Sequence, residues 1–81
     1  MPTPADPTLL PLCQLPAGEA GRVRELAGDG NFRQHIRELG LGESAQVTKI
    51  SGRTTIICHV NGTRIALSHR AASQILVQPS V

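Results

Sequence analysis

The chain has 81 residues, of which 40% are hydrophobic and only one, Phe32, is aromatic, and its eight Lys and Arg stand against six Asp and Glu. This length predicts one small domain with a core of aliphatic side chains. A net charge of +2 and the lack of an aromatic platform argue against a nucleic acid or a membrane as a partner bound by charge or stacking.

The cysteines and the apolar runs indicate where in the cell the protein is located. Cys13 and Cys58 have the spacing of neither a zinc motif nor a dithiol redox motif. No apolar run approaches the roughly 18 residues of a membrane span, and the first residues do not resemble a secretory signal. We therefore expect reduced cysteines and a cytoplasmic location.

The first residues are rich in proline. Residues 1–11, MPTPADPTLLP, hold four of the six prolines, and proline fixes φ and lacks a backbone donor. We predict a flexible segment over residues 1–11, a folded domain over residues 12–78 and a C-terminal tail over residues 79–81.

A first strand is predicted after the turn-forming residues 16–21. In the stretch RVREL, residues 22–26, Val23 alternates with Arg22 and Arg24. This alternation is typical of a half-buried strand with both arginines on its outer face.

A helix is predicted next. Asn31 is the expected N-cap, and Gln34 can reach back to it in a variant of the capping box. Phe32, Ile36 and Leu39 recur at helical spacing and form one apolar stripe. The stripe indicates an amphipathic helix that packs on the core.

The sequence also predicts where this helix ends. Gly40 suits the left-handed C′ position, and Leu41 at C″ can contact Ile36 to complete a Schellman motif. The helix is therefore expected to be short, about two to three turns long.

The strongest turn pattern is the Asn-Gly pair within VNGT, residues 60–63. Both residues tolerate the positive φ values of a type I′ turn, so a hairpin is predicted. Its apolar residues would share one face. The expected pairs are Val60 with Thr63, Cys58 with Ile65, and Ile56 with Leu67.

A second hairpin is predicted around residues 51–53. Its register would put Val47 on the apolar face of the first hairpin. The expected pairs are Lys49 with Thr54, Val47 with Ile56, and Ala45 with Cys58.

The last elements complete the expected fold. Ser68 is expected to cap a helical turn, and residues 75–77 (ILV) return as a short strand. The whole order is typical of a small, mainly β barrel with one short α-helix and a further helical turn. The helix would cover one open end of this barrel with Phe32, Ile36 and Leu39.

Several features of residues 12–78 occur together in one known family. They are Leu39-Gly40-Leu41 after a basic helix, Val47 six residues later, and Gly62-Thr63-Arg64-Ile65-Ala66-Leu67 followed by Ala72 and Ile75. In this order and spacing they resemble the ferrous iron transport protein A family. The resemblance implies an SH3-like barrel. It also implies a non-enzymatic, cytoplasmic regulator whose partner is the ferrous iron transport protein B, a membrane permease with a G-protein domain.

The chain departs from this family at two loops. The family usually has Pro-Gly after its Leu-Gly-Leu, where this chain has Gly42-Glu43-Ser44. Relatives also carry a longer loop with Gly-Asp-Pro where only Ser51-Gly52-Arg53 remains. If the longer loop touches the partner in relatives, this chain must contact its partner differently.

Four arginines are the candidate partner-binding residues. Arg33 and Arg37 lie one helical turn apart on the flank away from the apolar stripe. Arg22 and Arg24 lie on the neighbouring strand. A partner contact and a merely solvated face both remain open as interpretations.

Metal binding is a second interpretation, with Cys13, Cys58 and His59 as candidate ligands for a weakly bound Zn or Fe. The adjacent residues Cys58 and His59 would point to opposite faces of one strand, which disfavours a shared ion. Completion of a two-thiol site would need His35, His69 or a second chain. We expect no required cofactor, and Cys58 is interpreted as a small core residue.

Catalysis is not expected. The stretch Gly28-Asp29-Gly30 lacks the lysine and the further glycine of phosphate-binding loops, and no spacing suggests a nucleophile with its base. A nucleic-acid-binding barrel is the rival interpretation, with Arg64 joining the four arginines in a phosphate track. Formation of a homodimer stays open.

Overall fold

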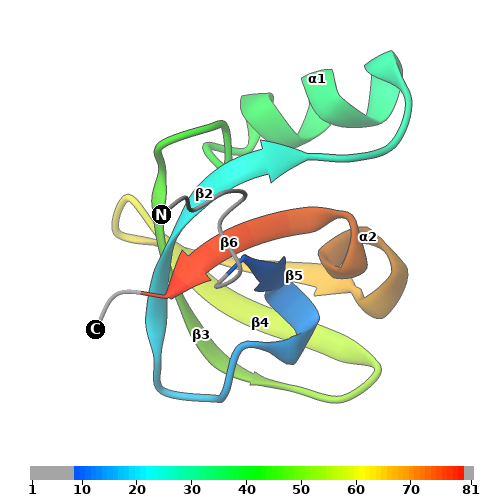
Figure 1. Ribbon diagram of the computed structural model, residues 1–81. Coiled ribbons are helices and arrows are strands. Elements are labelled where there is room, and N and C mark those ends of the chain that lie inside the picture. The colour runs from blue at the N-terminus through cyan, green and yellow to red at the C-terminus, as the bar shows by residue number, and fades with distance from the viewer. Residues whose placement is uncertain (1–8, 80–81) are drawn as a thin grey trace, which may run out of the picture.

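Six antiparallel strands form one sheet in the order β1-β6-β2-β3-β4-β5 (Figure 1). The computed structural model describes residues 9–79. The elements are β1 (Leu10–Pro11), the 3-10 helix η1 (Leu12–Gln14), β2 (Ala20–Leu26), α1 (Gly30–Glu38), β3 (Gln46–Gly52), β4 (Thr55–Val60), β5 (Thr63–Ser68), α2 (His69–Ser73) and β6 (Ile75–Pro79).

The mainly β architecture with a short helix and a further helical turn is confirmed, but closure into a barrel is not. The sheet is strongly curved (Figure 1), with β1 and β5 at its two edges. Within residues 9–79, no strand pairing joins these edges. β1 has only two residues and one of them is Pro11, which has no N–H to donate to a neighbouring strand.

The folded unit is slightly longer than residues 12–78. Leu10 and Pro11 pair with Val77 and Leu76 of β6, and Pro79 at the end of β6 pairs with Gly21. The remaining parts of the predicted N-terminal segment and tail, residues 1–8 and 80–81, lie outside the described residues.

The hairpin of β4 and β5 has the predicted turn and register. Asn61 and Gly62 adopt φ values of 53° and 77°, as a type I′ turn requires. All three expected pairs are present, namely Val60 with Thr63, Cys58 with Ile65, and Ile56 with Leu67.

The predicted register of β3 with β4 is wrong. Val47 pairs with Val60 rather than with Ile56, a shift of four residues, and a bulge after Lys49 changes the register again before Ser51. The turn therefore lies at residues 53–54. Because four is an even number, Val47 still faces the interior, where it is fully buried.

Helix α1 begins earlier than predicted. Asp29, not Asn31, is the N-cap, and its carboxylate accepts a hydrogen bond of 2.8 Å from the N–H of Phe32. Asn31 lies inside the first turn. Two candidate capping residues follow one another closely here, and only the backbone path decided between them.

The predicted Schellman motif closes the other end of α1. The N–H of Leu41 donates to the carbonyl of Ile36 at 3.1 Å, and that of Gly40 donates to Arg37 at 3.0 Å. Gly40 has a φ of +94°, a value that glycine adopts without the Cβ penalty. The helix end is thus determined by residues 36–41 alone.

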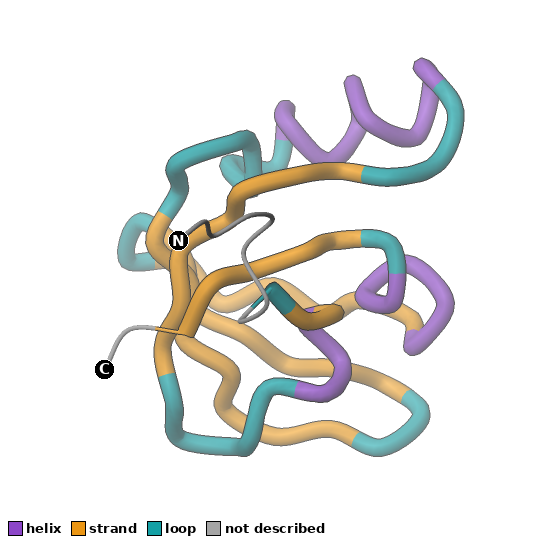
Figure 2. Tube along the Cα trace, viewed as in Figure 1, coloured by secondary structure: helices purple, strands orange, loops and turns teal. Residues whose placement is uncertain are grey.

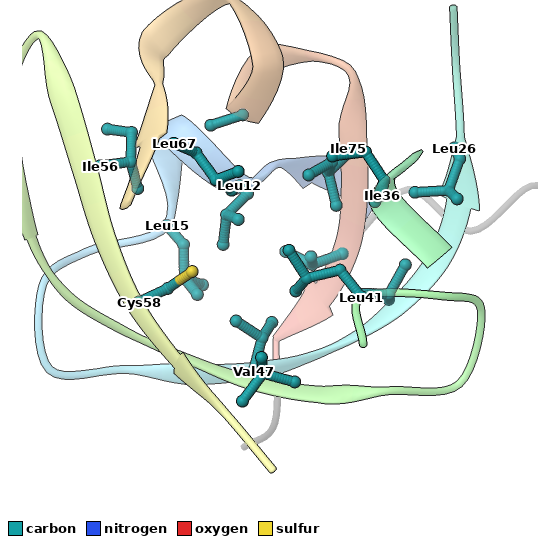
Figure 3. Close-up of a cluster of buried hydrophobic side chains, with 14 residues drawn as sticks. Leu12, Leu15, Leu26, Ile36, Leu41, Val47, Ile56, Cys58, Leu67 and Ile75 are labelled. Atoms are coloured by element: carbon teal, nitrogen blue, oxygen red, sulfur yellow. The ribbon is translucent and has the colours of Figure 1, made fainter. Parts of the chain in front are cut away.

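The core is covered from two sides (Figure 3). Ile36 is 1% exposed and is the fully buried side chain of α1, whereas Phe32 and Leu39 are only half-buried against the core. Figure 2 shows α1 standing clear of most of the sheet. Leu12, the first residue of the 3-10 helix, and Leu15, which directly follows that helix, are fully buried and cover another part of the core.

Candidate functional site

The turn between α1 and β3 brings two of the predicted partner-binding arginines together. The N–H of Ala45 donates to the carbonyl of Gly42 at 3.0 Å, and Ser44 has a φ of +78°. An i to i+3 hydrogen bond with positive φ at the third residue indicates a type II turn. Glu43 and Ser44 thus occupy the two positions where Pro and Gly are the preferred residues.

This turn is held against β2 by backbone hydrogen bonds. The N–H of Ser44 donates to the carbonyl of Val23 at 2.7 Å, and the N–H of Val23 donates to Ala45 at 2.8 Å. Arg22 adds a side-chain bond, from Nη1 to the carbonyl of Ser44, at 2.9 Å. Arg22 therefore holds the turn as well as facing solvent.

Arg37 and Glu43 join α1 to the same turn. Arg37 Nε donates to Glu43 Oε1 at 3.1 Å and Nη2 donates to Oε2 at 3.0 Å, the two-pronged geometry that suits a guanidinium and a carboxylate. The hydrogen bond from Arg37 is the main reason that the pKa of Glu43 falls to about 2, and it also raises the pKa of Arg37. The charge of Arg37 is thus matched within the chain.

The other two predicted arginines differ from each other. Arg33 is half-buried, and its Nη1 donates to the carbonyl of Gly28 at 2.7 Å, so it supports the loop that leads into α1. Arg24 on β2 is exposed and makes no hydrogen bond or ion pair with any described residue. The role of these four arginines in binding stays a prediction.

The predicted metal ligands are spread over the molecule. Cys58 is fully buried beside Leu15 (Figure 3), and burial raises the pKa of its thiol. His59 is exposed on the opposite face of β4, and Cys13 is half-buried in the 3-10 helix. Among residues 9–79, no three His, Cys, Asp or Glu lie close enough together to hold a metal ion.

Lys49 is a buried polar residue whose role the sequence did not reveal. Its side chain is 6% exposed, and Nζ donates to the carbonyl of Cys13 at 2.9 Å. The backbone of Lys49 also bonds to Gly18 and Glu19, at 2.7 and 3.0 Å. Lys49 of β3 therefore holds residues 13–19 against the sheet. Its bond to Cys13 spans 36 residues of sequence, and no local pattern indicates it.

The second half of the chain carries a charge pattern that the net charge conceals. After Glu43 the sequence has no Asp or Glu, yet it has one Lys and three Arg. The three arginines are exposed, on or beside β4, β5 and α2. They are Arg53, Arg64 and Arg70.

Sequence comparison decides the family. Residues 10–79 match the family described as FeoA domain. The chain belongs to the FeoA family. No curated protein sequence matches the chain. The match confirms the predicted family and the predicted SH3-like fold. FeoA-family proteins function in ferrous iron transport.

Solved structures agree with this assignment. The crystal structure of an iron uptake regulatory protein (FeoA) superposes with a TM-score of 0.84 at 28% identity, covering 89% of this chain and 97% of that chain. The solution structure of FeoA from Chlorobium tepidum superposes at 0.80 with 24% identity, covering 89% and 71%. A manganese-dependent transcriptional repressor has a TM-score of 0.86 at 18% identity, covering 95% of this chain and 44% of the repressor, and shares the fold.

Proposed function

We propose that this FeoA-family chain is a non-catalytic, cytoplasmic regulatory module that binds the G-protein domain of the ferrous iron transporter. The observation that carries the proposal is the family match over residues 10–79, together with the superposition on almost the whole of a FeoA protein. Within residues 9–79, no helix is long and apolar enough to span a membrane.

The contact surface that we propose is the basic flank formed by α1 and β2. The Arg24 side chain bonds to none of residues 9–79, and Arg33 donates one hydrogen bond to the carbonyl of Gly28, which leaves further donors on its guanidinium. Arg37 is already paired with Glu43. A partner carboxylate would have to compete with Glu43 for Arg37, so Arg24 and Arg33 are expected to contribute more.

Titration calorimetry with the isolated G-protein domain of the transporter tests both parts of this proposal. We expect the unmodified chain to bind, and Arg24→Glu/Arg33→Glu to weaken binding about tenfold or more. Arg53→Glu/Arg70→Glu is the matched control, because it makes the same change of charge on the other side of the molecule. No binding by the unmodified chain would refute the function, whereas equal binding by both double variants would refute the contact surface.

A further inference from the structure

The three arginines that follow Glu43 lie on or beside the hairpin of β4 and β5. His59 on β4 lies directly opposite Arg64 on β5, and both are exposed. The pairing of Thr55 with Ser68, and the hydrogen bond from the N–H of His69 to the carbonyl of Thr54, bring the β3–β4 turn to the start of α2. Arg53 in that turn and Arg70 in that helix therefore lie at the same end of β5.

These positive charges have no counter-charge within the described residues. Arg53, Arg64 and Arg70 take part in no salt bridge and their side chains make no hydrogen bond in residues 9–79. All five carboxylates of the described residues lie between Glu19 and Glu43. The arginines around α1 and β2 contrast with this, because three of the four bond to a carboxylate or a carbonyl.

An apolar strip lies between the charges. Ile56 and Cys58 face the core, so Ile57 between them points to the outer face of the sheet. Ile57 is half-buried and pairs with the exposed Ala66 of β5. Ile50 lies in the bulge of β3, opposite Ile57 and Cys58 of β4. It is 40% exposed, the largest exposure of any bulky hydrophobic residue in the described part of the chain.

We propose that the outer face of β3, β4 and β5 is a docking surface for an acidic polypeptide segment of another protein, with carboxylates at its ends and an apolar side chain in its middle. Carboxylates would pair with Arg64 at one end and with Arg53 and Arg70 at the other. The apolar side chain would cover Ile57 and Ala66. Ser68 is four positions after Arg64, which is about 13 Å along a strand, so an extended segment of about five residues spans the surface.

The chemistry of this face favours a polypeptide over a nucleic acid. A phosphate chain is bound by a track of cations and by aromatic side chains that stack on bases. Here three arginines flank an apolar centre, and the chain's one aromatic residue, Phe32, lies elsewhere on α1. The surface extends beyond the proposed transporter contact, because it uses none of the residues of the α1 and β2 flank.

Fluorescence anisotropy with a labelled peptide of sequence EELVLEE tests this inference on the full chain. We expect saturable binding that weakens as salt is raised, because the contacts are between charges on the surface. Arg53→Glu/Arg64→Glu should weaken binding about tenfold or more. Arg24→Glu is the matched control for the single variant Arg64→Glu, because each makes the same change of charge, and only Arg64→Glu should lower the affinity. Circular dichroism verifies that each variant is folded, and all three positions are exposed.

Two further measurements identify the surface and the partner class. Amide chemical shifts in a titration should move at Ile57, Arg64 and Ala66 and stay fixed on α1. The peptide KKLVLKK should not bind. The inference is overturned if EELVLEE does not bind, if it binds Arg53→Glu/Arg64→Glu equally well, or if a labelled oligo(dT) binds this face more tightly than the peptide does.

Discussion

The arginines of the α1 side and those of the β3–β5 side differ in what surrounds them. Around α1 and the following turn, Arg22, Arg33 and Arg37 each bond to a carbonyl or a carboxylate of the chain itself. On the other side, the side chains of Arg53 and Arg64 form no hydrogen bond or ion pair with any described residue. The basic residues of one small domain can thus serve two purposes. Paired arginines hold local geometry in place, and unpaired arginines are available to a partner.

The largest expected effect concerns how firmly the α1 side is attached to the core. Ile36 is the fully buried side chain of α1 and lies near Leu41 and Ile75 (Figure 3). Ile36→Ala should lower the free energy of unfolding by about 2–5 kcal/mol, because it leaves a cavity in the core. Urea denaturation measures this change, with Gln34→Ala on the exposed face as the control. A loss well under 1 kcal/mol would show that α1 is not held by this contact.

The second expected effect concerns the β3 side, where Lys49 connects the sheet to residues 13–19. Lys49→Ala should lower the free energy of unfolding by about 1–3 kcal/mol, because the partly buried carbonyl of Cys13 loses its partner and the buried aliphatic stem of Lys49 is removed. Lys49→Met keeps the stem and separates the two causes. Equal stability of Lys49→Ala and the unmodified chain would contradict this role.

The third effect is a gain in stability at the turn next to α1. Ser44 has a φ of +78° at the position of a type II turn that glycine prefers. Ser44→Gly should therefore raise the free energy of unfolding by about 0.5–1 kcal/mol. Ser44→Ala, which keeps the Cβ, is the control and should give no gain. If Ser44→Gly destabilises the chain, the assigned turn type is wrong.

The smallest effect is a loss of stability at acidic pH that arises from the pair of Arg37 and Glu43 beside α1. The pKa of Glu43 is lowered from 4.5 to about 2 in the folded chain, chiefly by the hydrogen bond from Arg37. A lowered folded pKa gives stability above pH 4.5 that is lost as the pH falls towards 2. Because the pair is exposed, the change should be small.

Thermal unfolding between pH 5 and pH 2 measures this dependence. Glu43→Gln should unfold with a shallower loss of stability over that range than the unmodified chain. Arg53→Gln is the control, because Arg53 has no carboxylate partner among the described residues. Identical profiles for Glu43→Gln and the unmodified chain would show that the Arg37–Glu43 pair does not persist in solution.

Local patterns in the sequence predicted local structure well. The type I′ turn at Asn61-Gly62, the Schellman motif at Gly40 and the cap at Ser68 are all present. Each depends on hydrogen bonds between residues at most five positions apart, so the amino acids concerned are sufficient to specify it. The same patterns carry the family resemblance that the comparisons confirm.

The register of β3 against β4 was not predictable in the same way. The turn at residues 53–54 lacks an Asn-Gly or Asp-Gly pair, and the bulge after Lys49 inserts a residue that no pattern marks. The prediction of the buried face survived this error because the shift was even. Closure into a barrel was not confirmed, since β1 has only two residues and one of them is Pro11, which cannot donate to a neighbouring strand.

By itself, the sequence determined the tight turns and helix ends apart from the N-cap of α1, the apolar face of β3 to β5 and the absence of acidic residues after Glu43, because each follows from neighbouring residues or from their order. Only the tertiary structure decided which positively charged side chains bond to other parts of the chain. Lys49 reaches Cys13 across 36 residues, and Arg37 finds Glu43 only once the turn has folded back on α1. Contacts between distant residues depend on how the chain packs, and packing is a property of the whole domain.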